Sequence, residues 1–183
     1  MAYSFIENAA GVMPIGNIDT GVLPPIATSS GSTTYIPSPP LVAGMIVKAV
    51  DPTYGMGEFI LLAGVGSTIV GSLVRYNTVS FATTLVVATA VQDMPVAVAM
   101  AANTSATNWA WYQIAGTAAL AKTAVIVLPN VAVYISATAG KVKALASAGL
   151  QVVACRSQLV TTASASSTVL VTISRPHLQS QIT

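Results

Sequence analysis

The chain has 183 residues, enough for one domain or for one domain with an additional arm. Charged residues make up 7% of the chain and apolar residues 54%, whereas about 25% of a typical soluble domain is charged. A soluble monomer usually keeps a charged surface without large apolar patches. The composition therefore argues against a free monomer and indicates a protein that packs against other subunits.

Charge and hydropathy argue against two classes of partner. The net charge of +2 includes seven basic residues scattered between Lys48 and Arg175, whereas nucleic-acid-binding domains usually carry clustered Lys and Arg. A membrane-spanning helix needs about 20 mostly apolar residues. The longest weakly polar stretch, residues 59–74, is shorter and contains several Gly and Ser residues. We expect two strands joined by a turn there, and neither nucleic acid nor membrane as a partner.

Residues 1–40 differ in composition from the rest of the chain and predict an extended N-terminal arm. Their prolines exclude a long helix and a regular central strand. A disordered tail is depleted in large apolar residues, but this segment contains many, so we expect the arm to order itself against its own domain or, as we favour, against another chain. The anchors proposed for that interface are Tyr3, Phe5, Ile6, Met13, Ile15 and Ile18.

From residue 41 onward, short apolar runs alternate with turn residues and predict a β domain, residues 41–183, that ends in a short C-terminal tail. Turn signals roughly every 8–12 residues are typical of a sandwich or barrel. We predict an all-β fold, a barrel or jelly-roll-like β-sandwich preceded by the extended arm. The Ala-rich residues 116–122 favour strand over helix because of their neighbours. Expected strands cover residues 45–50, 58–63, 68–76, 80–90, 95–100, 109–115, 124–128, 132–137, 141–145, 150–156 and 168–174.

The sequence offers few residues for catalysis or metal binding. Its five acids are Glu7, Asp19, Asp51, Glu58 and Asp93, and it has one histidine, His177, and one cysteine, Cys155. A structural zinc site needs four ligands, and a catalytic histidine needs an oriented nucleophile and acid. We expect His177 to be a solvated tail residue and Cys155 a buried apolar thiol. No enzyme activity, metal or cofactor is therefore expected.

Asp51 and Glu58 flank the loop DPTYGMGE, in which two carboxylates can approach each other across a turn. Together with loop carbonyls they would suit Ca²⁺. The alternative, which we favour, is a loop in which Asp51 starts a turn and Glu58 opens the next strand.

Two further motifs resemble functional sequences in form. Gly64-Val65-Gly66 lacks the third glycine in phase and the lysine of a phosphate-binding loop, so it predicts a turn between strands. Asn103-Thr104-Ser105 is an N-glycosylation sequon, but nothing else in the sequence indicates secretion.

The segment Trp109-Ala110-Trp111-Tyr112 is the most informative side-chain group. On a strand, Trp109 and Trp111 share one face and Tyr112 takes the other. Trp and Tyr are enriched at interface hot spots, and they are also the large residues that an otherwise small-residue core needs. Core and interface both stay open, and we include all three among the candidate interface residues.

Two stretches together resemble a known family. They are GMIVKAVDPTYGMGEFILLAGVGSTIVGSLVRYN (44–77) and PVAVAMAANTSATNWAWYQIAGTA (95–118), and residues 130–173 continue the pattern. The sequence is similar to the small head proteins of tailed bacteriophages that act as decoration, cement or capsid-stabilising proteins. Ala110 stands where the family often has glycine. The resemblance depends on Trp109, Trp111, Tyr112, Gln113, Gly116, Gly140 and Gly149.

This resemblance spans residues 44–174 and implies a β-barrel or jelly-roll-like domain on the outer surface of a virion head, made in the host cytoplasm. It implies a structural protein, often a homotrimer, that bridges major capsid protein subunits and stabilises the capsid. The alternative is a head fibre or a receptor- or glycan-binding β module, in which Trp109 and Trp111 would form a stacking platform.

Overall fold

β-Strands are the regular secondary structure of the part of the chain that the structure describes, and turns and loops connect them. The computed structural model describes residues 3–5, 18, 22–23, 26–27, 35–36, 41–88, 94–161 and 167–179, and contains no helix in these ranges. The predicted all-β class is therefore confirmed. The strands are β1 (Ser4–Phe5), β2 (Val22–Leu23), β3 (Ile26–Ala27), β4 (Tyr35–Ile36), β5 (Ile46–Asp51), β6 (Gly55–Ala63), β7 (Leu73–Tyr76), β8 (Thr83–Leu85), β9 (Val96–Ala99), β10 (Trp109–Ala121), β11 (Ala132–Ile135), β12 (Val142–Lys143), β13 (Gln151–Ser157) and β14 (Thr168–Leu178).

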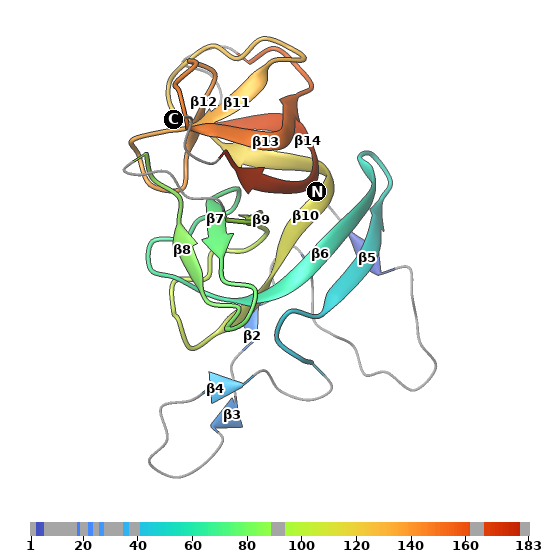
Figure 1. Ribbon diagram of the computed structural model, residues 1–183. Helices are drawn as coiled ribbons and strands as arrows, with labels where there is room; N and C mark the ends of the chain where they lie inside the picture. Colours follow the sequence, from blue (N-terminus) through green and yellow to red (C-terminus); the bar gives the residue numbers. More distant parts are fainter. Residues whose placement is uncertain are drawn as a thin grey trace.

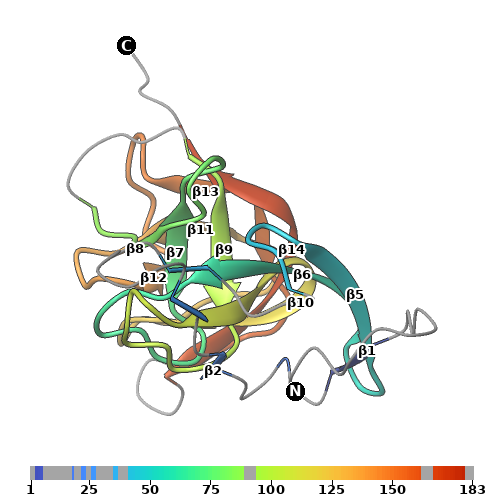
Figure 2. The ribbon, with the colours of Figure 1, turned by 90° about the horizontal axis from the view of Figure 1, so that it is seen from below.

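Antiparallel pairing joins most strands into one sheet that curls into a half-barrel (Figure 1). Its order is β1-β5-β6-β10-β14-β13-β11-β12, and β8, β7 and β9 branch from β10. The short pair β3–β4 forms a second sheet at the end of the molecule opposite β11 and β12. Seen from below, β5 and β1 lie to one side of the body (Figure 2). The predicted barrel-like architecture is thus realised as an open, curled sheet.

The long strand β10 changes partner at a bulge. Its first half pairs with β6, and its second half pairs with β14. The register with β6 shifts between Gln113 and Ala115, and Gly116 has a φ of +99°. A Cβ at Gly116 would lie 2.5 Å from the carbonyl oxygen of Met56. Glycine is therefore required here, because both the positive φ and the close backbone approach exclude a side chain.

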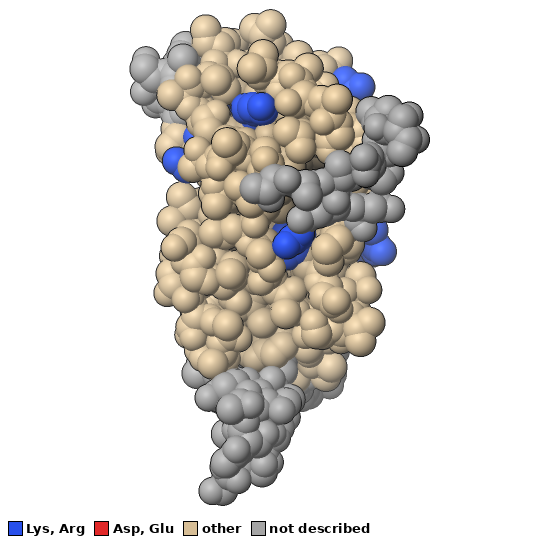
Figure 3. All heavy atoms as spheres, turned by 60° about the vertical axis from the view of Figure 1, so that its left-hand side comes forward, with Lys and Arg blue, Asp and Glu red and all other residues tan. Residues whose placement is uncertain are grey.

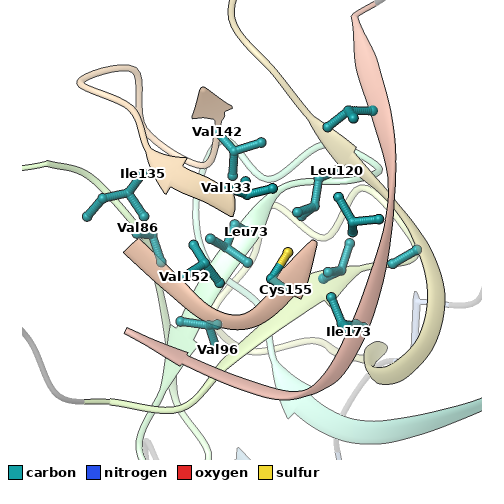
Figure 4. Packing of buried hydrophobic residues seen from close by; sticks show 14 of the residues in the cluster. Leu73, Val86, Val96, Leu120, Val133, Ile135, Val142, Val152, Cys155 and Ile173 are labelled. Atoms are coloured by element: carbon teal, nitrogen blue, oxygen red, sulfur yellow. The ribbon is translucent and has the colours of Figure 1, made fainter. Parts of the chain in front are cut away.

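The core is divided between the two faces of the curled sheet. The largest apolar cluster joins side chains from β7, β9 and β10–β14, including Leu73, Leu120 and Val152, and they point toward one another in Figure 4. A second cluster holds Phe59, Leu61 and the two tryptophans, and a third holds Tyr112 with β6, β7 and β9 residues. Strand alternation thus supplies two buried faces from β6 and β10.

Several expected strands differ from the observed ones. Residues 124–128 form no strand; Val127 makes an isolated bridge with Thr161. Of the expected strand at residues 80–90, the described residues 80–88 form only β8, and residues 116–121 extend β10 as strand rather than helix. The segment 59–74 forms the end of β6, a turn and the start of β7, as predicted, but β7 begins at Leu73, so residues 68–72 of the expected strand belong to the turn. None of the described segments is a helix that could cross a bilayer.

The expected C-terminal tail begins later than predicted. β14 continues to Leu178 because a bulge near Arg175, which has a φ of +48°, lets the strand bend and resume pairing with β13. His177 lies opposite Val153 and bridges Pro95. His177 is exposed, as predicted, but it is a strand residue rather than a tail residue.

Candidate functional site

The aromatic segment of β10 lies in the core of the chain. Trp109 is 5% exposed, and Trp111 and Tyr112 are fully buried. The two tryptophans share one apolar cluster and Tyr112 joins another, so the predicted alternation of faces is confirmed. Of the two alternatives, the structure shows core packing within one chain. No ring of these three residues is available as a stacking platform for a glycan.

Polar groups beside Tyr112 also have structural roles. Burial raises the pKa of Tyr112 to about 12, while the neighbouring side chains of Thr83 and Asn103 act in the opposite direction. Asn103 is fully buried, and its Nδ2 donates a hydrogen bond to the carbonyl of Asn108 at 3.1 Å. A Cβ at Gly64 would lie 2.4 Å from the Asn103 amide. The sequon asparagine is thus enclosed in the fold, where a glycan cannot be attached.

Two of the expected arm anchors pack on their own domain. Tyr3 is 6% exposed and its ring meets Phe59 edge-on, with centroids 4.8 Å apart. Its hydroxyl donates to the carbonyl of Thr117 at 2.9 Å and accepts from Nε2 of Gln113 at 3.3 Å. Ile18 is 1% exposed and belongs to the same cluster. For these two residues, the alternative that the arm packs on its own domain holds.

The other arm anchors remain candidates for a partner contact. The backbone of Phe5 lies in β1, which pairs with β5 in the register Phe5↔Ala49. Ile6, Met13 and Ile15 lie outside the described residues.

The loop between Asp51 and Glu58 forms a turn in which the Asp51 carboxylate binds backbone N–H groups. Oδ1 of Asp51 accepts hydrogen bonds from the backbone N–H groups of Thr53 at 2.7 Å and Tyr54 at 2.9 Å. Glu58 instead forms an ion pair with Arg175, with 3.2 Å between Oε2 and the guanidinium. The favoured turn interpretation of Asp51 is confirmed, although Glu58 lies within β6 rather than at its start. In the described ranges, no group of three or more His, Cys, Asp or Glu residues is placed to hold a metal ion.

The single thiol is enclosed in the largest apolar cluster. Cys155 is 3% exposed on β13, and burial raises its pKa to about 12. The thiolate is the nucleophilic form, so this cysteine is unreactive at neutral pH. The predicted buried apolar thiol is confirmed.

The composition indicated a surface that other subunits cover, but it did not locate the exposed apolar side chains. Among the described residues, twelve large apolar side chains are exposed, with fractions of 42–86%. A continuous apolar run such as residues 124–128 is typical of a buried strand, which is why its exposure was not foreseen. The exposed side chains are Val42, Ile46, Val50, Met56, Ile69, Val70, Val79, Ile126, Leu128, Leu145, Leu159 and Val160.

Part of this surface forms a hollow of about 350 Å³ at the end of the molecule that carries β11 and β12. We call it the apolar groove. Its two walls are the loop that leads into β11 and the chain just after β12. It is lined by Val125, Ile126, Leu128, Val131, Ala144 and Leu145.

Hydrogen bonds give the apolar groove its shape. Lys122 is buried, and its Nζ donates to the carbonyls of Thr123 at 3.4 Å and Val125 at 3.1 Å. The backbone N–H of Thr123 bonds the carbonyl of Val142, which ties the loop to β12. Val127 and Thr161 exchange two backbone hydrogen bonds, of 3.1 and 2.8 Å. The groove is therefore built into the folded chain.

Comparison with known proteins assigns no family. No protein-family model matches the sequence, and no curated protein matches it significantly.

Proposed function

We propose that this chain is a structural virion protein that decorates and stabilises a phage capsid by bridging major capsid protein subunits. Its place is the outer surface of the head, its partners are the major capsid protein and further copies of itself as a homotrimer, and its role is not catalytic. The proposal combines the family resemblance of residues 44–174 with the character of the folded surface.

The observation that carries the proposal is an almost uncharged surface that exposes large apolar side chains. Lys and Arg appear as separate spots in Figure 3, and no acidic atoms are visible on that face. Of the five acids, two lie among the described residues: Asp51 is buried and Glu58 pairs with Arg175. Contiguous exposed apolar side chains, such as Ile126, Leu128 and Leu145 at the apolar groove, are typical of surfaces covered by a partner, and a lattice of subunits supplies such cover.

Energetics favour attachment at many sites together. Fully burying one Val, Leu, Ile or Met side chain contributes about 1.5–3 kcal/mol relative to full exposure, and the exposed residues here are already partly covered. Lost translational and rotational freedom opposes association by several kcal/mol. One protomer therefore binds a shell modestly, whereas linked protomers in a trimer gain affinity through their high effective concentration.

The alternative function, a head fibre or a receptor- or glycan-binding β module, has less support. Its glycan-binding form relied on Trp109 and Trp111, the two tryptophans of the chain, and both side chains are buried. A glycan array probed with the purified protein tests this alternative directly.

The test of the proposed function compares virus particles with and without this chain. Particles that lack it should assemble shells of normal size, because the major capsid protein builds the lattice. These shells should burst at lower temperature and milder osmotic shock than decorated ones, and adding purified protein should restore their resistance. Failure of shells to form without the chain would identify a lattice-forming coat protein instead and contradict the proposal.

A further inference from the structure

Charge is distributed unequally along the chain. All five acids, Glu7, Asp19, Asp51, Glu58 and Asp93, occur before residue 94. Residues 94–183 contain no acid, although they carry five of the seven basic residues: Lys122, Lys141, Lys143, Arg156 and Arg175. β9 through β14, which supply most of the largest apolar cluster, therefore come from a half of the sequence with positive charge alone. A sign asymmetry of this kind points to a negatively charged partner.

The apolar groove lies within this acid-free half. Lys143 directly precedes the wall residues Ala144 and Leu145 and is half-buried. On the other wall, the exposed Arg156 donates a hydrogen bond to the carbonyl of Asn130, next to Val131, at 3.1 Å. The groove thus has an apolar lining. Two basic residues lie next to it, and we call them the basic rim: Lys143, which precedes one wall in the sequence, and Arg156, which bonds the backbone beside the other wall.

We propose that the apolar groove is the docking site for a protein segment that projects apolar side chains flanked by carboxylates. The proposal rests on the proposed function, in which that segment belongs to the major capsid protein. Apolar contact supplies most of the affinity, and the basic rim steers and orients the acidic segment.

A second copy of the same face is a poorer occupant. Pairing across a twofold axis brings identical patches together, which would place Lys143 and Arg156 of both copies around one apolar contact with no acid from this half of the chain to offset them. Like charges at an interface oppose association.

Nucleic acid also fits the groove less well. Phosphate backbones are bound by several Lys and Arg side chains, and the floor of this groove consists of Val, Ile, Leu and Ala side chains. Apolar side chains of a protein partner match that floor.

The experiment measures binding of fluorescently labelled full-length protein to shells that lack it. The groove variant carries Leu128→Ser and Leu145→Ser, whose side chains are 57% and 68% exposed. The control carries Ala102→Ser and Ala106→Ser, which are exposed, lie outside the groove and do not belong to the twelve large apolar side chains. Both variants should keep the wild-type melting temperature. The groove variant should lose at least tenfold in affinity, and the control should stay within twofold of wild type.

Two further double variants, each lacking two basic side chains, test the role of the basic rim. Lys143→Gln with Arg156→Gln should slow association and flatten its dependence on salt, because the steering charges are removed. Lys48→Gln with Arg75→Gln removes the same number of charges outside the acid-free half and should leave both quantities near wild type.

Each outcome has one meaning. If wild type binds shells and the groove variant binds equally well, the groove assignment is wrong while the proposed function stands. If wild type does not bind shells, the proposed function is wrong, and so is the assignment of the groove as a docking site for the major capsid protein. If a labelled DNA duplex binds wild type and the groove variant loses that binding, the partner is a nucleic acid and the proposed protein segment is overturned.

Discussion

The hydroxyl of Tyr3 donates a hydrogen bond to the carbonyl oxygen of Thr117 at 2.9 Å, across 114 positions of sequence. Nε2 of Gln113 donates to the same carbonyl at 2.9 Å and to the Tyr3 hydroxyl at 3.3 Å. These bonds lie where β10 bulges, so the start of the chain is fastened to the strand that joins the two halves of the sheet.

Replacing Tyr3 by Phe should lower the free energy of unfolding by about 1–2 kcal/mol, because both hydrogen bonds of the Tyr3 hydroxyl are lost while Thr117 and Gln113 stay bonded to each other. Urea denaturation measures this difference. Tyr54→Phe, on a half-exposed turn, is the control and should change stability little. Equal stability of Y3F and wild type would show that the arm is not fastened at Tyr3.

Replacing Gly116 by Ala should destabilise the domain by about 2–4 kcal/mol, since a positive φ is strained for alanine and its Cβ would meet the carbonyl of Met56. Gly66→Ala is the matched control, because nothing lies within 4 Å of a Cβ there. Thermal unfolding of the two variants should separate them clearly. Similar melting temperatures would mean that the bulge can relax without cost.

Alkaline pH should destabilise this protein because the buried thiol of Cys155 and the buried hydroxyl of Tyr112 must lose their protons. Cys155 and Tyr112 both have a folded pKa raised to about 12 by burial, above the ordinary values of 9.0 and 10.0. The unfolded chain therefore releases these protons first, so stability is full below pH 9 and falls as pH rises from about 9 to 12.

The measurement is the urea midpoint as a function of pH. Tyr112→Phe should reduce the decline above pH 10, and Cys155→Ala the decline that starts near pH 9. In the native protein at pH 8, the thiol should resist a disulfide reagent that labels it rapidly after unfolding. Rapid labelling of the folded chain would contradict the buried position of Cys155.

Removing the carboxylate of Asp51 should lower the stability of the protein, because this carboxylate holds the turn after β5. Asp51→Ala should cost about 1–2 kcal/mol, because two backbone N–H groups lose their acceptor, whereas Asp51→Asn keeps an oxygen in place and should cost less. Urea denaturation of the two variants measures this difference.

Glu58→Gln breaks an ion pair whose Arg175 side chain is 67% exposed, and such pairs contribute little to stability. EDTA should leave the melting temperature unchanged, and a drop would indicate a bound cation.

The amino-acid pattern alone determined the local structure of the chain. Alternation in residues 109–112 placed the two tryptophans on one face and Tyr112 on the other, because side chains on a strand point to opposite sides in turn. Asp51 before Pro52 indicated a turn closed by a carboxylate, and the glycines after Ala63 indicated the break between β6 and β7. Each of these features depends on neighbours in sequence.

Tertiary packing decided which surfaces are buried. Residues 124–128 have the composition of a core strand, yet Ile126 and Leu128 are exposed because the loop is held at the sheet's end by Lys122 and by the bridge to Thr161. Tyr3 and Ile18 became core residues because the curled sheet presents Phe59 and Thr117 to the arm. A side chain is buried when segments far apart in the sequence pack against it. Which segments come together depends on how the sheet bends at its bulges.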